Sequence, residues 1–193
     1  MLIEIISKFN FLDIIILIIL FRVCYVAIHT GLPVELFKLV GTLAAIYLSL
    51  HYYIFLSDLI QKKVDLSLMP LEFADFLIFL CLAIIGYLFF VAWRGVFFNF
   101  IKLEAVAALS KWGGLFLGVL RGILLVGLIS FSLSISSISY LNKSVKSSYL
   151  GSRVFRVAPD TYRWLWDSFF SKFMGSEKFN KEVVMIVHKF FNK

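Results

Sequence analysis

Few residues in this chain could do chemistry, and the most informative are three charged side chains within long apolar stretches: Asp13, Glu35 and Arg121. A charged side chain in membrane hydrocarbon costs about 2.5–3.5 kcal/mol on insertion scales, so it usually faces an opposite charge or water. Two interpretations are open. The three residues line a polar path through a helix bundle, or they form one or two ion pairs that hold the helices in register.

The spacing of the charged residues along each helix limits which of them can form ion pairs. Glu35 and Lys38 are three residues apart, so they share a helix face and can pair. Asp13 and Arg22 are nine residues apart, about 900° of helix, so they point in opposite directions. Arg121 is the deepest charge, and Asp13 and Glu35 are the opposite charges nearest to it in depth. We favour ion pairs over a polar path.

Catalytic and metal-binding patterns are absent from the sequence. The histidines and cysteines are scattered along it: Cys24, His29, His51, Cys81 and His188. They match no metal-ligand spacing, and no nucleophile elbow or phosphate loop occurs. We interpret His51 as a structural or interfacial residue. The sequence therefore predicts a protein that is not an enzyme and holds neither a metal nor a cofactor.

The composition is that of a membrane protein. Of the 193 residues, 61% are hydrophobic and 16% are charged, whereas a soluble domain is nearer half apolar and a quarter charged. Four segments could each cross about 30 Å of hydrocarbon, which takes about 20 helical residues. The expected spans are Phe11–His29, Val34–Ser57, Phe73–Trp93 and Trp112–Leu141.

The expected fold is all-α, an integral membrane bundle of four transmembrane helices with a C-terminal amphipathic helical tail. The backbone finds no hydrogen-bond partners in hydrocarbon, so each span is helical, including Ile129–Ile135, where serines alternate as in a strand. We divide the chain into a membrane domain, residues 1–141, and a tail, residues 142–193. The connections are expected to be a polar loop at Asp58–Met69, a short interfacial helix at Asn99–Lys111 and a linker at Ser144–Ser152.

Small residues recur every four positions on two of the spans. One row is on the second span and the other on the fourth: Gly41, Ala45 and Ser49, and Gly114, Gly118 and Gly122. Such rows let helix backbones approach closely in membranes. We expect the second and fourth spans to pack together along these rows, with Arg121 beside the contact.

The tail carries most of the positive charge. Residues 142–193 have 10 basic and 4 acidic side chains, against 9 and 8 in residues 1–141. An apolar stripe recurs there every three or four residues: Tyr162, Leu165, Trp166, Phe169 and Phe173. Basic aromatic helices lie on membrane surfaces, so we expect contact with the bilayer and its anionic head groups. The residues expected there are Arg163, Trp166, Phe169 and Phe173. Docking on the protein's own loops is the alternative, and nucleic acid is not an expected partner.

Several of these residues together form a wider pattern. An Asp opens the first span, a Gly and a Glu four residues later open the second, and Gly-x-x-x-Gly-x-x-Arg-Gly opens the last. In this chain they are Asp13, Gly31, Glu35, Gly114, Gly118, Arg121 and Gly122. Over roughly residues 11–170 the chain resembles the colicin V production protein family (CvpA), bacterial inner-membrane proteins. Thr30 and Ser110-Lys111 depart from it, where the family often has Arg and Asp-Arg.

The resemblance implies a multi-pass protein of the bacterial inner membrane that supports production or export of a peptide toxin and envelope homeostasis. Its implied partners are envelope or export proteins, or a second copy of the chain as a homo-oligomer. The alternative is a small-solute or ion transporter or channel component, with Asp13, Glu35 and Arg121 lining the path. Counting positive charges puts the tail in the cytoplasm. Family relatives with a protease domain outside the membrane put it outside, which is our expectation.

Overall fold

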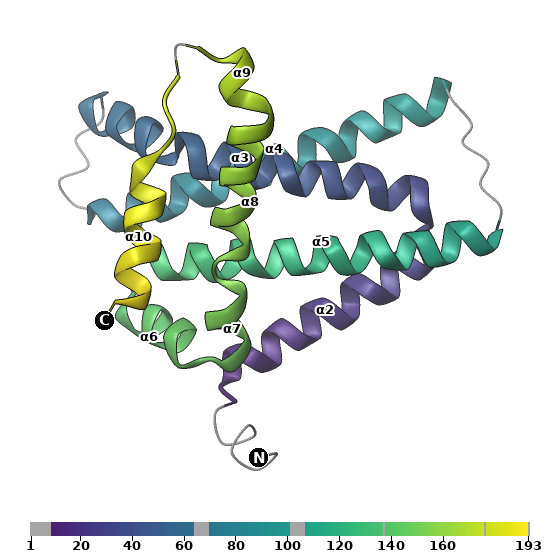
Figure 1. The fold of residues 1–193 in the computed structure, drawn as a ribbon, viewed down its shortest axis with the longest axis horizontal. Coiled ribbons are helices and arrows are strands. Elements are labelled where there is room, and N and C mark those ends of the chain that lie inside the picture. The colour runs from purple at the N-terminus through teal and green to yellow at the C-terminus, as the bar shows by residue number, and fades with distance from the viewer. Residues whose placement is uncertain (1–8, 64–69, 101–106, 137, 176, 193) are drawn as a thin grey trace.

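Four long helices form the body of the protein in the computed structural model, which describes residues 9–63, 70–100, 107–136, 138–175 and 177–192 (Figure 1). They are α2 (Phe11–Thr30), α3 (Leu32–Lys63), α4 (Leu71–Phe100) and α5 (Ala107–Ile135). Each is long and apolar enough to cross a membrane. The described residues contain no strand. The predicted all-α fold with four membrane-spanning helices is therefore confirmed.

The first two helices are set by local signals at their ends. Asn10 caps α2, because its side-chain oxygen accepts a hydrogen bond from the N–H of Phe11, 2.6 Å away. In return its own N–H donates to the Asp13 carboxylate at 2.8 Å, which completes a capping box. Gly31 alone separates α2 from α3. Its φ of 77° favours glycine, and this one residue turns the chain back on itself.

Two helices are longer than the sequence indicated. The stretch from residue 58 to 63 was expected in a loop but continues α3, and α4 runs past Trp93 to Phe100. The 32 residues of α3 extend for about 48 Å, against about 30 Å of hydrocarbon. Helix α3 must therefore tilt or project into the head groups. The remainder of the expected loop, residues 64–69, and residues 101–106 of the expected interfacial helix lie outside the described residues.

The serine-rich end of α5 is helical, as predicted. The Ser132 hydroxyl donates to the Ile129 carbonyl at 2.8 Å, and the Ser136 hydroxyl donates to the Leu133 carbonyl at 2.7 Å. These bonds satisfy the hydroxyls locally, so the alternation of serines does not require a sheet. Helix α5 ends at Ile135, earlier than the expected Leu141.

The tail is a series of short helices that turns across the bundle. It comprises α6 (Ser139–Ser147), α7 (Tyr149–Val154), α8 (Val157–Leu165), the π-helical turn η1 (Trp166–Phe170), α9 (Ser171–Phe173) and α10 (Lys181–Phe191). The expected linker at Ser144–Ser152 is wrong, because α6 and α7 occupy it and Ser144, Ser148 and Gly151 are buried. The boundary drawn at residue 142 falls inside α6.

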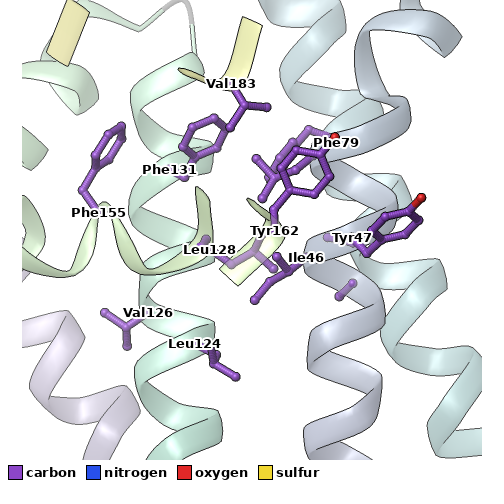
Figure 2. Close-up of a cluster of buried hydrophobic side chains, with 14 of the residues drawn as sticks. Ile46, Tyr47, Phe79, Leu124, Val126, Leu128, Phe131, Phe155, Tyr162 and Val183 are labelled. Carbon is purple, nitrogen blue, oxygen red and sulfur yellow. The ribbon is translucent and has the colours of Figure 1, made fainter. Parts of the chain in front are cut away.

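The tail completes a shared aromatic core with α4 and α5 (Figure 2). The rings of Phe79 and Phe131 lie 5.7 Å apart, those of Phe131 and Phe155 lie 5.6 Å apart, and those of Phe155 and Phe190 lie 3.9 Å apart. These rings come from α4, α5, the end of α7 and α10. The tail therefore docks on the protein itself, as the alternative from sequence had it, but on its helices and not on its loops. Burying these rings holds it there.

The small-residue rows pack against partners other than those expected. On α3, a Cβ at Gly41 would stand 3.2 Å from the Tyr87 carbonyl of α4, and Gly86 of α4 meets the Ala45 backbone. Ser49 is buried and its hydroxyl donates to the Ala45 carbonyl at 2.7 Å.

The row on α5 faces α2. Gly114 lies against Ala27 and Gly31, Gly118 against Ala27, and Gly122 against Leu20 and Val23. The prediction that the two rows pack on each other is wrong, because a small-residue row marks a face of close approach without identifying the helix that approaches it.

We predict that Gly118→Leu destabilises the protein. A side chain there would overlap the Ala27 methyl group, and overpacking of this kind costs about 1–3 kcal/mol. The matched control is Gly95→Leu, since nothing lies within 4 Å of a Cβ at Gly95 on α4. Both changes replace a helical glycine by leucine, so the difference isolates the clash. Denaturant unfolding in detergent measures it, and equal stability of the two variants would contradict the α2–α5 contact.

Candidate functional site

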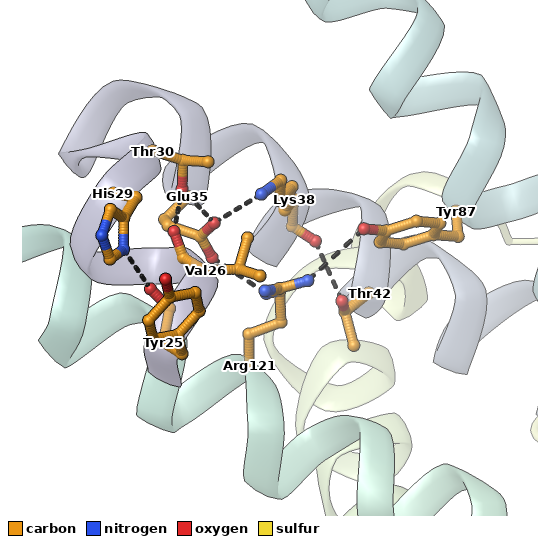
Figure 3. Close-up of polar contacts among 9 residues, drawn as sticks. All are labelled: Tyr25, Val26, His29, Thr30, Glu35, Lys38, Thr42, Tyr87 and Arg121. Carbon is orange, nitrogen blue, oxygen red and sulfur yellow. Dashed lines mark hydrogen bonds and ion pairs between the residues drawn. The ribbon is translucent and has the colours of Figure 1, made fainter. Parts of the chain in front are cut away.

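A buried carboxylate at the start of α3 gathers partners from two other helices (Figure 3). The Thr30 hydroxyl at the end of α2 donates to Glu35 Oε1 at 2.7 Å, and Lys38 Nζ, one turn along α3, lies 2.6 Å from the same oxygen. Arg121 Nε reaches from α5 to within 3.0 Å of Oε2. The predicted Glu35–Lys38 pair is confirmed, and Glu35 is the acid that faces Arg121.

The charges in this cluster do not balance. The side chain of Glu35 is 0% exposed, that of Arg121 7% and that of Lys38 12%. Two cations thus share one carboxylate, which leaves a net charge of +1. Arg121 Nη1 also donates to the Tyr87 hydroxyl of α4 at 3.4 Å. Because breaking a buried ion pair leaves an uncompensated charge, this arrangement holds α3, α4 and α5 in register.

Asp13 lies at the other end of α2, away from this cluster. Its carboxylate accepts hydrogen bonds from the Ser148 hydroxyl at 2.6 Å and from the N–H groups of Leu150 and Tyr149 at 2.7 and 3.2 Å. The fully buried Asp13 therefore caps α7 and ties the tail to α2. Seventeen residues separate it from Thr30, about 25 Å along a helix. The structure does not bring all three predicted charges together along one path.

Sequence reasoning missed a second polar cluster, formed by His51, Tyr162 and Glu177. His51 Nδ1 lies 2.8 Å from the Tyr162 hydroxyl, and Nε2 lies 2.9 Å from the Glu177 carboxylate. The Tyr162 oxygen also accepts the Asn180 N–H at 3.0 Å. Burial raises the pKa of Tyr162 to about 12. A carboxylate only accepts hydrogen bonds, so in the neutral imidazole Nε2–H donates to Glu177 and Nδ1 accepts from the Tyr162 hydroxyl. These contacts join α3 to the tail, and the partners of His51 lie over 100 residues away, beyond any local signal. The interpretation of His51 as a structural or interfacial residue stays a prediction.

The tail residues predicted to lie at the membrane surface divide into two groups. Phe169 and Phe173 are 51% and 85% exposed, and the Arg163 side chain is 70% exposed. Trp166 is only 8% exposed and stacks on His51 with ring centroids 5.2 Å apart. Its predicted place at the membrane surface is wrong, because this ring fills the contact between α3 and the tail.

The π-helical turn explains why the aromatic stripe breaks. A π-helix takes more residues per turn than an α-helix. The next residue on the buried face is therefore Phe170, whereas α-helical spacing predicted Phe169. Phe170 stacks on Tyr47 of α3 with ring centroids 3.7 Å apart. Phe169 consequently points outward.

The described side chains include no group of three or more His, Cys, Asp or Glu residues that could hold a metal ion. Comparison with known proteins gives one family. The family model described as Colicin V production protein matches residues 12–176. That range includes Glu35, Arg121 and the part of the tail that binds Asp13. No curated protein and no solved structure matches the chain.

We predict that Glu35→Leu destabilises the protein by about 3–5 kcal/mol, since it leaves the buried Arg121 and Lys38 without their carboxylate. In Glu35→Leu/Arg121→Met the ion pair between α3 and α5 is replaced by apolar residues, and Lys38 is the one cation of the cluster that remains. The double variant should therefore be more stable than Glu35→Leu alone. Denaturant unfolding in detergent gives the coupling energy.

The control for this cycle is Arg22→Met, which removes an exposed arginine from α2. Exposed substitutions usually change the free energy of unfolding by less than about 0.5 kcal/mol. Additive effects of the two single variants at Glu35 and Arg121 would show that the pair does not join α3 to α5.

Proposed function

This chain belongs to the Colicin V production protein family, and from that premise we propose that it supports production or export of a peptide toxin and envelope homeostasis. In this proposal it is a multi-pass protein of the bacterial inner membrane and has no enzymatic activity. It acts as a membrane scaffold on which envelope or export proteins, or a second copy of the chain, assemble.

The observation that carries the scaffold role is that the deep carboxylates are occupied by internal contacts. Asp13 and Glu35 are both 0% exposed, and each joins segments far apart in sequence: α2 to α7, and α3 to α5. A transport path would need such groups to face water or a passing solute. Both carboxylates are used to join helices to one another. This supports the scaffold role, in which the protein presents a fixed surface to its partners.

The outer face of α4 supports contact with lipid or another membrane protein. Its exposed apolar side chains recur at helical spacing: Ile84, Ile85, Leu88, Phe89, Trp93 and Val96. Apolar side chains on the outside of a transmembrane bundle face acyl chains or a partner helix. This face is where a second copy or an export protein would pack.

The same variants at Glu35 and Arg121 test the proposed function in cells. Deletion of the gene in a bacterium that secretes a peptide toxin should lower toxin activity in the culture supernatant. It should also increase the release of a periplasmic marker enzyme into the medium, which reports a leaky envelope. Glu35→Leu should restore neither, because it leaves two buried cations without their carboxylate and destabilises the protein.

The double variant Glu35→Leu/Arg121→Met distinguishes a scaffold from a transport path, with membrane levels checked by immunoblot. If the pair is a cross-link, an apolar replacement restores secretion. Normal membrane levels without secretion would instead show that the charges themselves are needed, and would overturn the scaffold role. Unchanged toxin activity after deletion would overturn the proposed link to toxin production.

We also propose that the tail lies outside the cytoplasm. Two exposed lysines at opposite ends of the bundle report it: Lys178, between α9 and α10, and Lys111, near the start of α5. Each is changed to Cys after Cys24 and Cys81 are changed to Ser. A membrane-impermeant thiol reagent on intact spheroplasts should label the variant at position 178 and not that at 111. The reverse pattern would place the tail in the cytoplasm.

A further inference from the structure

A cavity of about 580 Å³, lined by polar and apolar side chains, lies at the end of the bundle where α4 begins and α5 ends. Residues of α6 and α10 in the tail line its other sides. Nothing in the scaffold role accounts for it. Its volume is within the range of about 300–1,000 Å³ typical of small-ligand sites.

Opposite charges line two sides of this cavity. Glu72 and Asp75, from the first two turns of α4, form an acidic side, and Lys143, Lys146 and Lys189, from α6 and α10, form a basic side. Among the described residues, no ion pair within 4.0 Å joins these lysines to either acid. Two sets of charges thus line one space without direct contact between them.

Hydroxyl side chains also line this cavity or lie next to its acids. Tyr53 of α3 and Ser134 of α5 both line the cavity, although they are only 2% and 8% exposed. The buried Ser57 hydroxyl lies beside the Asp75 carboxylate. Hydroxyls can donate or accept hydrogen bonds, so they suit a ligand that carries both kinds of group.

The cavity lies at the depth of lipid head groups. Helix α2 has 20 residues, or about 30 Å, which matches the thickness of membrane hydrocarbon. Its first turn is bonded to α7 through Asp13, so α7 lies near one edge of the hydrocarbon. In Figure 1, α6 and α10 lie beyond α7, on the side away from most of α2. The cavity between them is therefore just outside the hydrocarbon.

We propose that this cavity binds an aminoalkyl phosphate, the chemistry of the phosphatidylethanolamine head group, with the phosphate at the lysines and the ammonium at Glu72 and Asp75. Lysine ammonium groups are common phosphate ligands. A primary ammonium has three donors for carboxylates. This assignment is independent of the proposed role in toxin production, because it uses residues outside the buried charge cluster.

Other ligand classes fit only one side. A metal cation or a simple amine would leave the three lysines unpaired, and inorganic phosphate or an anionic head group would leave the two acids unpaired. A choline head group carries both charges, but its quaternary nitrogen has no N–H to donate to the carboxylates. A ligand that carries both a phosphate and a protonated amine satisfies both sides.

Titration calorimetry of the purified, delipidated full chain in detergent tests the assignment. The probes are the dihexanoyl forms of phosphatidylethanolamine, phosphatidylcholine and phosphatidylglycerol, and free phosphoethanolamine. We expect phosphatidylethanolamine to bind at least about tenfold more tightly than the other two lipids, which is about 1.4 kcal/mol. Stronger binding of the lipid than of free phosphoethanolamine identifies a membrane lipid as the ligand, and the reverse order identifies a free aminoalkyl phosphate.

Two exposed residues, one from each side, give variants that should keep the fold. Glu72→Gln should weaken phosphatidylethanolamine binding about tenfold and leave phosphatidylglycerol binding unchanged, because only the ammonium contact is lost. Lys189→Gln should weaken both. The controls are Asp160→Asn and Lys172→Gln, which change exposed residues that do not line the cavity.

Three results would overturn the assignment. One is equal binding of phosphatidylglycerol and phosphatidylethanolamine, since the acidic side would then recognise no ammonium. Another is unchanged binding in both cavity variants, with their fold verified by circular dichroism. The third is no binding of any aminoalkyl phosphate. None of these results would affect the toxin-secretion test, which uses the Glu35–Arg121 pair.

Discussion

The arrangement of the spans depends on one buried carboxylate. Glu35 has no exposed side-chain surface, and an ionised carboxylate in such a place needs both charge partners and hydrogen bonds. Arg121 can reach Glu35 from α5 only if α5 lies at one particular height along α3 and is rotated so that this side chain faces α3. With Arg121 turned toward α3, Gly118 and Gly122 lie about 60–100° away around the helix and face α2.

A second carboxylate joins the tail to this bundle. Asp13 accepts two backbone N–H groups and one hydroxyl at the start of α7, where orphan donors need an acceptor. Once α7 is held there, Phe155 reaches the ring of Phe131 and α8 lies across α3. The tail is therefore part of the folded unit, which agrees with a family match that continues to residue 176.

Whether a contact in the site could be predicted depends on how far apart in the sequence its two residues lie. Glu35 and Lys38 share one helix, so their pairing followed from spacing. Asp13 and Glu35 were both expected near Arg121 in depth, but Asp13 lies at the other end of α2 and bonds to α7. Which of them meets Arg121 required the packing of α2, α3 and α5. The contacts of His51 with Tyr162 and Glu177 join positions more than 100 residues apart, and no local pattern encodes them.

The sequence alone determined the four membrane-spanning helices, because hydrocarbon forces any long apolar segment to satisfy its own backbone hydrogen bonds. It also determined the family, through residues at fixed spacing. Only the tertiary structure decided three further features: the partner of each small-residue row, the burial of Trp166 against α3 with Phe169 exposed beyond the π-helical turn, and the conversion of Ser144–Ser152 from an apparent linker into helices. Periodicity states which face of a helix is buried, whereas the identity of the covering element depends on how all helices share the available volume.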